Sequence, residues 1–171
     1  MKKSITPCPF LSCAEESKRY GWIEITNRCN LKCPYCYADS TKNDKKELSF
    51  EKIKEVLLDF KKINAEVVMI SGGEPTLMRE IVDILEFGSN LGLKMFLVSN
   101  GTILNSKIIK TLSVHKIPIQ LSIDSIDPET YKKARGVDLL PAVLKNIDLL
   151  MKSNVAVSLA STLTKITKQS A

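Results

Sequence analysis

The run Glu66-Val67-Val68-Met69-Ile70 limits what this chain can fold into more than any other stretch of its sequence. It is apolar almost throughout and rich in β-branched residues, which predicts a strand covered on both faces, as in parallel sheets flanked by helices. A segment with helical periodicity precedes it, and Ser49 suits the N-cap of that helix. The apolar positions on one face of this helix are Phe50, Ile53, Val56, Leu57, Phe60 and Ile63.

The alternation of strand and helix patterns continues along the chain. The predicted strands are 22–26, 66–70, 94–98, 117–124 and 155–163. The helices between them are predicted to start near Ser49, Arg79, Ser106, Asp127 and Pro141. Such alternation predicts an α/β fold with parallel strands and right-handed crossovers. In these folds the functional loops gather at the carboxyl edge of the sheet.

The length of 171 residues suits a single domain. Residues 1–20 hold Cys8 and Cys13 among prolines and show no period, which predicts an irregular N-terminal segment. Residues 21–171 are expected to form the core domain. Because the last residues stop where another helix is expected to begin, we predict that this domain is incomplete at its C-terminus.

The formal net charge is +6, but lysines and arginines are spread among acidic residues, so a nucleic-acid partner is not expected. No apolar run approaches the roughly 18 residues of a membrane span. The start Met1-Lys2-Lys3-Ser4 leads into prolines and cysteines rather than the apolar core of a signal peptide. We therefore expect a cytoplasmic globular protein without a membrane span.

Three of the five cysteines follow the first predicted strand as Cys29-x3-Cys33-x2-Cys36. Cysteines in a chain without a secretion signal favour metal ligation or redox chemistry over disulfides. Three thiolates on one short loop match three irons of a [4Fe–4S] cube and leave the fourth iron without a protein ligand. Such an open iron can bind a substrate or cosubstrate directly.

Other roles for these cysteines remain open. A structural zinc site prefers four protein ligands, usually as two separated pairs. A thioredoxin-like pair at Cys33 and Cys36 fits poorly beside a third cysteine on a loop after a strand. Cys8 and Cys13 could belong to an auxiliary cluster, to a gating loop or to neither. The alternative to an enzyme is therefore a non-catalytic iron–sulfur or zinc-binding module.

A second distinctive loop, Ser71-Gly72-Gly73-Glu74-Pro75-Thr76, follows the second predicted strand at the same edge of the sheet. Glycines let backbone carbonyls approach a ligand, and a carboxylate favours an ammonium group. Taken alone, Gly-Gly-Glu-Pro would be an ordinary turn.

Together the two loops resemble the radical SAM superfamily. Its signature is Cys-x3-Cys-x2-Cys after the first strand of a partial (β/α)6 barrel, with an aromatic residue before the last cysteine, here Tyr35. It also has a Gly-Gly-Glu motif after the second strand, here Gly72-Gly73-Glu74. The resemblance covers roughly residues 21–165 and implies a partial (β/α)6 radical SAM barrel with only five βα units, truncated or shortened.

The resemblance implies a [4Fe–4S] cluster on Cys29, Cys33 and Cys36, with S-adenosyl-L-methionine as the cosubstrate. The open iron would chelate the amino and carboxylate groups of this cosubstrate. The residues implied to contact the cosubstrate's amino group are Gly72, Gly73 and Glu74.

Further positions match places where family members hold the cosubstrate's ribose and carboxylate. These are Asn100, Ser122 and Asp124, although Ser-Asn-Gly is also a common turn. Arg135 would pair with the methionyl carboxylate, or would be a surface arginine that closes a helix. The only histidine, His115, is expected at the surface.

The implied activity is that of a radical enzyme. An external one-electron donor of flavodoxin or ferredoxin type reduces the cluster, which cleaves S-adenosylmethionine into methionine and a 5′-deoxyadenosyl radical. The radical abstracts hydrogen from a small-molecule, lipid or peptide substrate. The stretch 135–141 and the N-terminal cysteine pair resemble a subgroup that includes archaeal tetraether-lipid synthases, but the pair departs from the expected Cys-x2-Cys spacing.

Overall fold

The computed structural model describes residues 19–38, 40 and 46–168. Over these residues, five parallel strands form one sheet in the order of the sequence, β1-β2-β3-β4-β5. The strands are β1 (Tyr20–Thr26), β2 (Val67–Gly72), β3 (Lys94–Ser99), β4 (Ile119–Ser122) and β5 (Val157–Ala160). The predicted α/β class is therefore confirmed. Cys8 and Cys13 lie outside the described residues.

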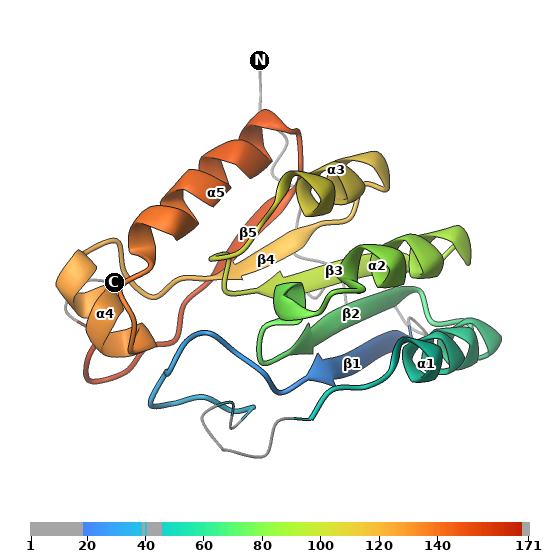
Figure 1. Ribbon diagram of the computed structural model, residues 1–171, viewed down its shortest axis with the longest axis horizontal. Helices are drawn as coiled ribbons and strands as arrows, with labels where there is room; N and C mark the ends of the chain where they lie inside the picture. The colour runs from blue at the N-terminus through green and yellow to red at the C-terminus, as the bar shows by residue number, and fades with distance from the viewer. Residues whose placement is uncertain (1–18, 39, 41–45, 169–171) are drawn as a thin grey trace.

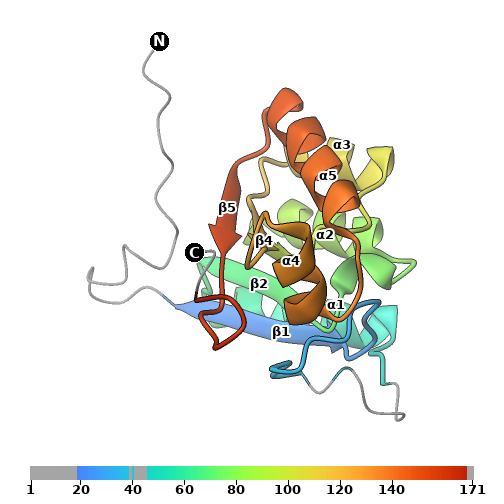
Figure 2. The same ribbon diagram turned by 90° about the vertical axis from the view of Figure 1, so that its left-hand side faces the viewer.

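Helices connect successive strands along one side of the curved sheet (Figures 1 and 2). They are α1 (Phe50–Lys62), α2 (Ile81–Asn90), α3 (Ser106–Val114), α4 (Pro128–Arg135) and α5 (Leu140–Lys152), and a 3-10 turn, η1 (Pro75–Leu77), precedes α2. The short helix α4 lies beyond the carboxyl ends of the strands (Figure 1). Within the described residues no helix follows β5, so the fifth predicted unit consists of its strand alone.

Local sequence accounts for where these helices begin. The Ser49 hydroxyl accepts a hydrogen bond from the Lys52 amide at 3.2 Å, which confirms the predicted cap of α1. Asn105 and Asp127 cap α3 and α4 in the same way. None of the helices in the part of the chain that the structure describes is long and apolar enough to cross a membrane.

The main core lies between the sheet and the helices. Side chains alternate along each strand, so Ile23 and Ile70, which are register partners, face this core together. From α1, the side chains of Ile53 and Leu57 are completely buried against it. The described helices therefore pack against one side of the sheet (Figures 1 and 2).

A smaller cluster of Val67, Met69 and Phe96 lies on the opposite, concave face of the sheet. Trp22 is on this face, since it pairs with Met69, and it is 47% exposed. A large apolar side chain is a core residue by default, which predicts a buried Trp22. This prediction is wrong because β1 is an edge strand and none of the described helices covers the concave face (Figure 2). Ile63 is also exposed, because it is the C-cap residue beyond the last turn of α1.

Each of the five strands differs from its predicted bounds, and β1, β4 and β5 illustrate the differences. β1 begins at Tyr20, which pairs with Val67, so the predicted boundary after residue 20 falls inside the strand. β4 starts only after Pro118, which has no amide hydrogen to donate. β5 ends at Ala160, and soon afterwards the Thr162 amide donates to the side chain of Asp124 at 2.8 Å instead of to a strand.

The adjacent leucines of α1 test this packing. We expect Leu57→Ala to lower the free energy of unfolding by about 2–5 kcal/mol, because it leaves a cavity in the main core. Leu58→Ala is the matched control, because Leu58 is 41% exposed and its loss should matter little. Urea unfolding followed by circular dichroism measures both. Equal losses for the two variants would contradict the assigned face of α1.

Candidate functional site

The three clustered cysteines lie on the segment that follows β1, here called the cysteine loop (residues 27–38), at the carboxyl ends of the strands (Figure 1). The chain leaves and returns at the same point: the Asn27 amide donates to the Lys46 carbonyl at 2.9 Å, and the Lys46 amide donates to Asn27 Oδ1 at 2.7 Å. Cys29, Cys33 and Cys36 are all free and half-buried. The loop therefore presents three thiols from one anchored base.

The Gly-Gly motif holds the start of this loop against the end of β2. The Gly73 amide donates to the Thr26 carbonyl at 2.6 Å, and the Glu74 amide donates to the Arg28 carbonyl at 2.7 Å. A Cβ at Gly73 would lie 2.3 Å from the Arg28 oxygen, and one at Gly72, whose φ is +135°, would lie 2.2 Å from the Thr26 oxygen. Both positions thus require glycine, because the backbone at the start of the cysteine loop lies too close to leave room for a side chain.

The Glu74 carboxylate is fully buried and accepts four hydrogen bonds. Oε1 accepts from the Thr76 amide and hydroxyl at 3.1 and 2.6 Å and from the Ser99 hydroxyl at 2.8 Å. Oε2 accepts from the Asn100 amide at 2.6 Å. Burial raises the pKa of this carboxyl, and the donors oppose that shift. The contact between Glu74 and an ammonium group stays a prediction, because a ligand would have to displace one of these donors.

Asn100 joins the end of β3 to the cysteine loop. Its Nδ2 donates to Asn30 Oδ1 at 2.9 Å and to the Cys29 sulfur at 3.7 Å. Its Oδ1 accepts from the Thr102 amide and hydroxyl at 2.9 and 2.7 Å, and Asn30 Nδ2 donates to the same hydroxyl at 2.8 Å. The side chains of Asn30, Asn100 and Thr102 therefore form one hydrogen-bonded network. This network also reaches the sulfur of Cys29, a candidate ligand of the cluster.

Tyr35, Asp124 and Arg135 also lie together. Asp124 Oδ2 accepts from the Tyr35 hydroxyl and forms an ion pair with Arg135 Nε at 2.7 Å, while Oδ1 accepts from the Thr162 amide. Both charged residues are buried. Burial, and then the hydrogen bond to Asp124, raise the pKa of Tyr35. Arg135 Nη1 reaches the Cys33 sulfur at 3.8 Å, so this trio connects the cysteine loop to β4 and α4.

A second glycine contact closes the other side of the loop. Gly136, at φ 72°, ends α4 in the left-handed conformation. A Cβ there would lie 2.5 Å from the Lys32 carbonyl oxygen, and the Lys32 amide donates to the Arg135 carbonyl at 2.9 Å. The cysteine loop is therefore held between Gly73 on one side and Gly136 on the other.

Three further hydroxyl groups belong to the site, those of Tyr37, Ser71 and Ser122. The Tyr37 hydroxyl and the Ser71 hydroxyl share a hydrogen bond at 2.9 Å, which ties the residue after Cys36 to the end of β2. Ser122 is half-buried, and none of the described residues bonds to its hydroxyl. Of the side chains predicted to contact the cosubstrate, Ser122 is thus the one that is free to bind a ligand as it stands.

The donor set fits a cluster in which each thiolate binds a separate iron. Burial raises the pKa of the Cys29 and Cys33 thiols, and hydrogen bonds from Asn100 and Arg135 act in the opposite direction. No group of three or more His, Cys, Asp or Glu side chains among the described residues is gathered closely enough to hold one metal ion. A cubane requires no such convergence, because its cysteines bind different irons.

Comparison with known proteins identifies the class. The family model described as the Radical SAM superfamily matches residues 23–170, so the chain belongs to the radical SAM superfamily. This superfamily uses a [4Fe–4S] cluster and S-adenosylmethionine. The predicted cofactors are therefore those of the family.

Two curated relatives are enzymes by name. Fe-coproporphyrin III synthase of Methanosarcina barkeri is 29% identical over 93% of this chain and 40% of its own length. The 7,8-dihydro-6-hydroxymethylpterin dimethyltransferase of Methanocaldococcus jannaschii is 36% identical over 74% of this chain and 26% of its own. The chain thus spans less than half the length of these relatives.

Solved structures confirm the fold. Streptococcus suis SuiB bound to S-adenosylmethionine superposes with a TM-score of 0.78 at 21% identity, covering 86% of this chain and 35% of SuiB. SuiB bound to the precursor peptide SuiA gives a TM-score of 0.77 at 22% identity, covering 86% and 34%. The five-stranded sheet described here is therefore part of a radical SAM barrel.

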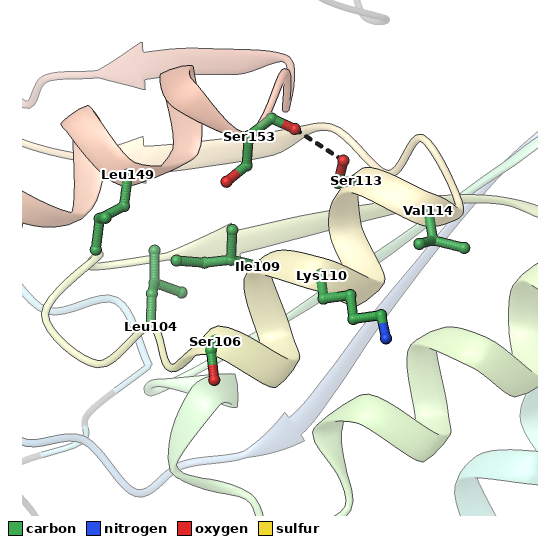
Figure 3. Close-up of a pocket in the computed structure, with 8 residues that line it drawn as sticks. All are labelled: Leu104, Ser106, Ile109, Lys110, Ser113, Val114, Leu149 and Ser153. Carbon is green, nitrogen blue, oxygen red and sulfur yellow. Dashed lines mark hydrogen bonds between the residues drawn. The ribbon is translucent and has the colours of Figure 1, made fainter.

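Two surface hollows lie away from the cysteine loop. One, of about 500 Å³, lies between α3 and α5 and includes Leu104, Ile109 and Leu149 in its lining (Figure 3). The other, of about 420 Å³, lies at the amino ends of the strands, where His115 is among its lining residues. Neither is lined by a cysteine.

Several residues of the site were not predicted from the sequence. Asn30 and Thr102 close the network around Asn100, and Tyr37 anchors the loop to β2. The one available signal was the polar run Ser99-Asn100-Gly101-Thr102 after a buried strand, since such side chains bond to nearby backbone. Asn30, the partner of Asn100 and Thr102 on the cysteine loop, lies about 70 residues away in the sequence. Only the pairing of the parallel strands brings these residues together.

Replacing Glu74 tests whether its carboxylate is structural. We expect Glu74→Gln to lower the free energy of unfolding by about 1–3 kcal/mol. The NH2 group that replaces one carboxylate oxygen would face an N–H or O–H donor and could not accept its hydrogen bond. Glu55→Gln on α1 is the control, since the Glu55 side chain is 63% exposed and the change should stay within about 0.5 kcal/mol. Urea titration measures both. An unchanged stability of Glu74→Gln would contradict the assigned hydrogen bonds.

Proposed function

We propose that this chain carries the catalytic core of a radical SAM enzyme. Its cysteines Cys29, Cys33 and Cys36 hold a [4Fe–4S] cluster with one open iron, which binds S-adenosylmethionine. When bound, these groups supply reductive cleavage of the cosubstrate to a 5′-deoxyadenosyl radical for hydrogen abstraction. The observation that carries the proposal is the three-thiol loop held directly against the Gly-Gly loop of the neighbouring strand.

The residues of this chain would divide two tasks. Gly72 and Gly73 lie next to the cysteine loop, and their backbone carbonyls would meet the amino group of the cosubstrate. Ser122 offers a hydroxyl to its ribose or carboxylate. Glu74, Asn100, Asp124, Arg135 and Tyr35 act in the site by holding the loop, because their polar groups already bond within the protein.

The substrate is a small molecule, a lipid or a peptide that supplies the hydrogen atom. Two classes find support in the relatives, because one of them is a coproporphyrin synthase by name and SuiB binds a precursor peptide. An external flavodoxin or ferredoxin would deliver the electron. The likeness to tetraether-lipid synthases and the auxiliary role of Cys8 and Cys13 stay predictions.

Anaerobic reconstitution with iron and sulfide tests the proposal. We expect the wild type to bind a [4Fe–4S] cluster and to release 5′-deoxyadenosine from S-adenosylmethionine in the presence of dithionite. Cys29→Ser, Cys33→Ser and Cys36→Ser should each lose the cluster signal and the product. Bound iron, electron paramagnetic resonance of the reduced protein and chromatography of the product are the readouts.

Cys13→Ser is the matched control, because it makes the same thiol-to-hydroxyl change outside the described residues. It should retain 5′-deoxyadenosine formation. Zinc bound in place of iron would support the binding-module alternative. A fully loaded cluster that never cleaves S-adenosylmethionine would contradict enzymatic activity of this chain.

A further inference from the structure

Two of the three clustered cysteine sulfurs accept an N–H group from a buried side chain outside the cysteine loop. Asn100 Nδ2 lies 3.7 Å from the Cys29 sulfur, and Arg135 Nη1 lies 3.8 Å from the Cys33 sulfur. The donors are only 6% and 7% exposed and come from the ends of β3 and α4. The Cys36 sulfur instead contacts the hydroxyl of Ser40, four residues along the chain, at 3.6 Å.

We propose that Asn100 and Arg135 set the reduction potential of the cluster by donating these hydrogen bonds to Cys29 and Cys33. This inference rests on the proposed function, since it requires the cluster on these cysteines. Hydrogen bonds to the sulfurs and local charge are two of the factors that determine iron–sulfur potentials. A donor stabilises the more negative, reduced cluster more than the oxidised one, so both residues raise the potential.

The network around Asn100 determines which end of its amide faces the sulfur. The Asn100 oxygen accepts from the Thr102 amide and hydroxyl, which are both donors toward it. A flipped amide would turn its NH2 group against the Thr102 amide hydrogen and its oxygen toward Cys29 and Asn30 Oδ1. The hydrogen bonds therefore require the orientation in which Nδ2 faces Cys29.

Glu74 extends this control one step further. Its Oε2 accepts from the Asn100 backbone amide at 2.6 Å, in a carboxylate that is completely buried. Glu74, the acidic residue of the Gly-Gly-Glu motif, thus holds in place the asparagine that donates to Cys29. Glu74 is therefore a positioning residue, and Asn100 is the residue that contacts the cysteine sulfur.

Arg135 is positioned by its ion pair. Asp124 binds Nε at 2.7 Å, which leaves Nη1 to face the Cys33 sulfur. Because Asp124 balances the charge of the guanidinium, the effect on Cys33 is that of a directed, charge-assisted N–H group rather than an unpaired cation. A lysine could keep the pair with Asp124, but a single ammonium cannot bond both partners in the same fork geometry.

A potentiometric titration followed by electron paramagnetic resonance tests the inference on the reconstituted chain. We expect Asn100→Ala and Arg135→Lys each to make one-electron reduction at least tenfold less favourable, a fall of about 59 mV in midpoint potential. The combined variant should show the sum of the two shifts, because the donors act on different cysteines.

Asn146→Ala is the matched control. Asn146 is also a buried asparagine, 7% exposed, and its Nδ2 donates to the Gly101 carbonyl at 2.8 Å, next to Asn100 but not to a sulfur. Its loss disturbs the same turn and should leave the potential unchanged. Equal potentials for wild type, Asn100→Ala and Arg135→Lys, or an equal shift in Asn146→Ala, would overturn the inference.

A measurement on the wild type covers the case in which a variant does not fold. Protein labelled with 15N-arginine should show a weak nitrogen coupling to the reduced cluster in electron spin echo spectra, and protein labelled with 15N-asparagine should show another. The absence of both couplings from a loaded cluster would overturn the inference alone. The absence of any cluster in the wild type would reject the proposed function and the inference with it.

Discussion

The buried carboxylate of Glu74 is the interaction on which the arrangement of the site depends. It accepts hydrogen bonds from Thr76 after β2 and from Ser99 and Asn100 at the end of β3, and no part of it is exposed. Burying an ionised carboxylate is costly unless every lone pair has a donor, and here four donors converge on it. The ends of two neighbouring strands are thereby fixed to one another and to the residue that contacts Cys29.

Two close backbone contacts extend this arrangement to the whole cysteine loop. Gly73 allows the loop to approach β2, and Gly136 allows it to approach α4, where in both cases a Cβ would overlap a carbonyl oxygen. Between these contacts, Tyr35 and Tyr37 bond to Asp124 and Ser71 on either side of Cys36. The three cysteines are thus presented by a short segment that the protein's own groups hold at several points.

The sequence predicted the fold and the motif loops because these follow from local patterns. An apolar run such as Val67–Ile70 predicts a buried strand, and a capped amphipathic segment such as α1 predicts a helix. Parallel strands then bring their carboxyl ends, and the loops that follow them, to one edge of the sheet. Trp22 was misplaced because an apolar residue type does not tell which face of an edge strand is covered. The bonds among Asn30, Asn100 and Thr102, and the pairing of Tyr35 with Asp124, depend on distances across the sheet that no local pattern contains.

Glu74 and the Asp124–Arg135 pair hold the cysteine loop from within the protein. A crystal structure of the reconstituted chain with its cluster and S-adenosylmethionine tests this directly. We expect that the Glu74 carboxylate still accepts hydrogen bonds from the Ser99 hydroxyl and the Asn100 amide, and that Asp124 still binds Arg135 and Tyr35. A Glu74 or Asp124 carboxylate turned onto the cosubstrate, with these internal bonds broken, would contradict this expectation.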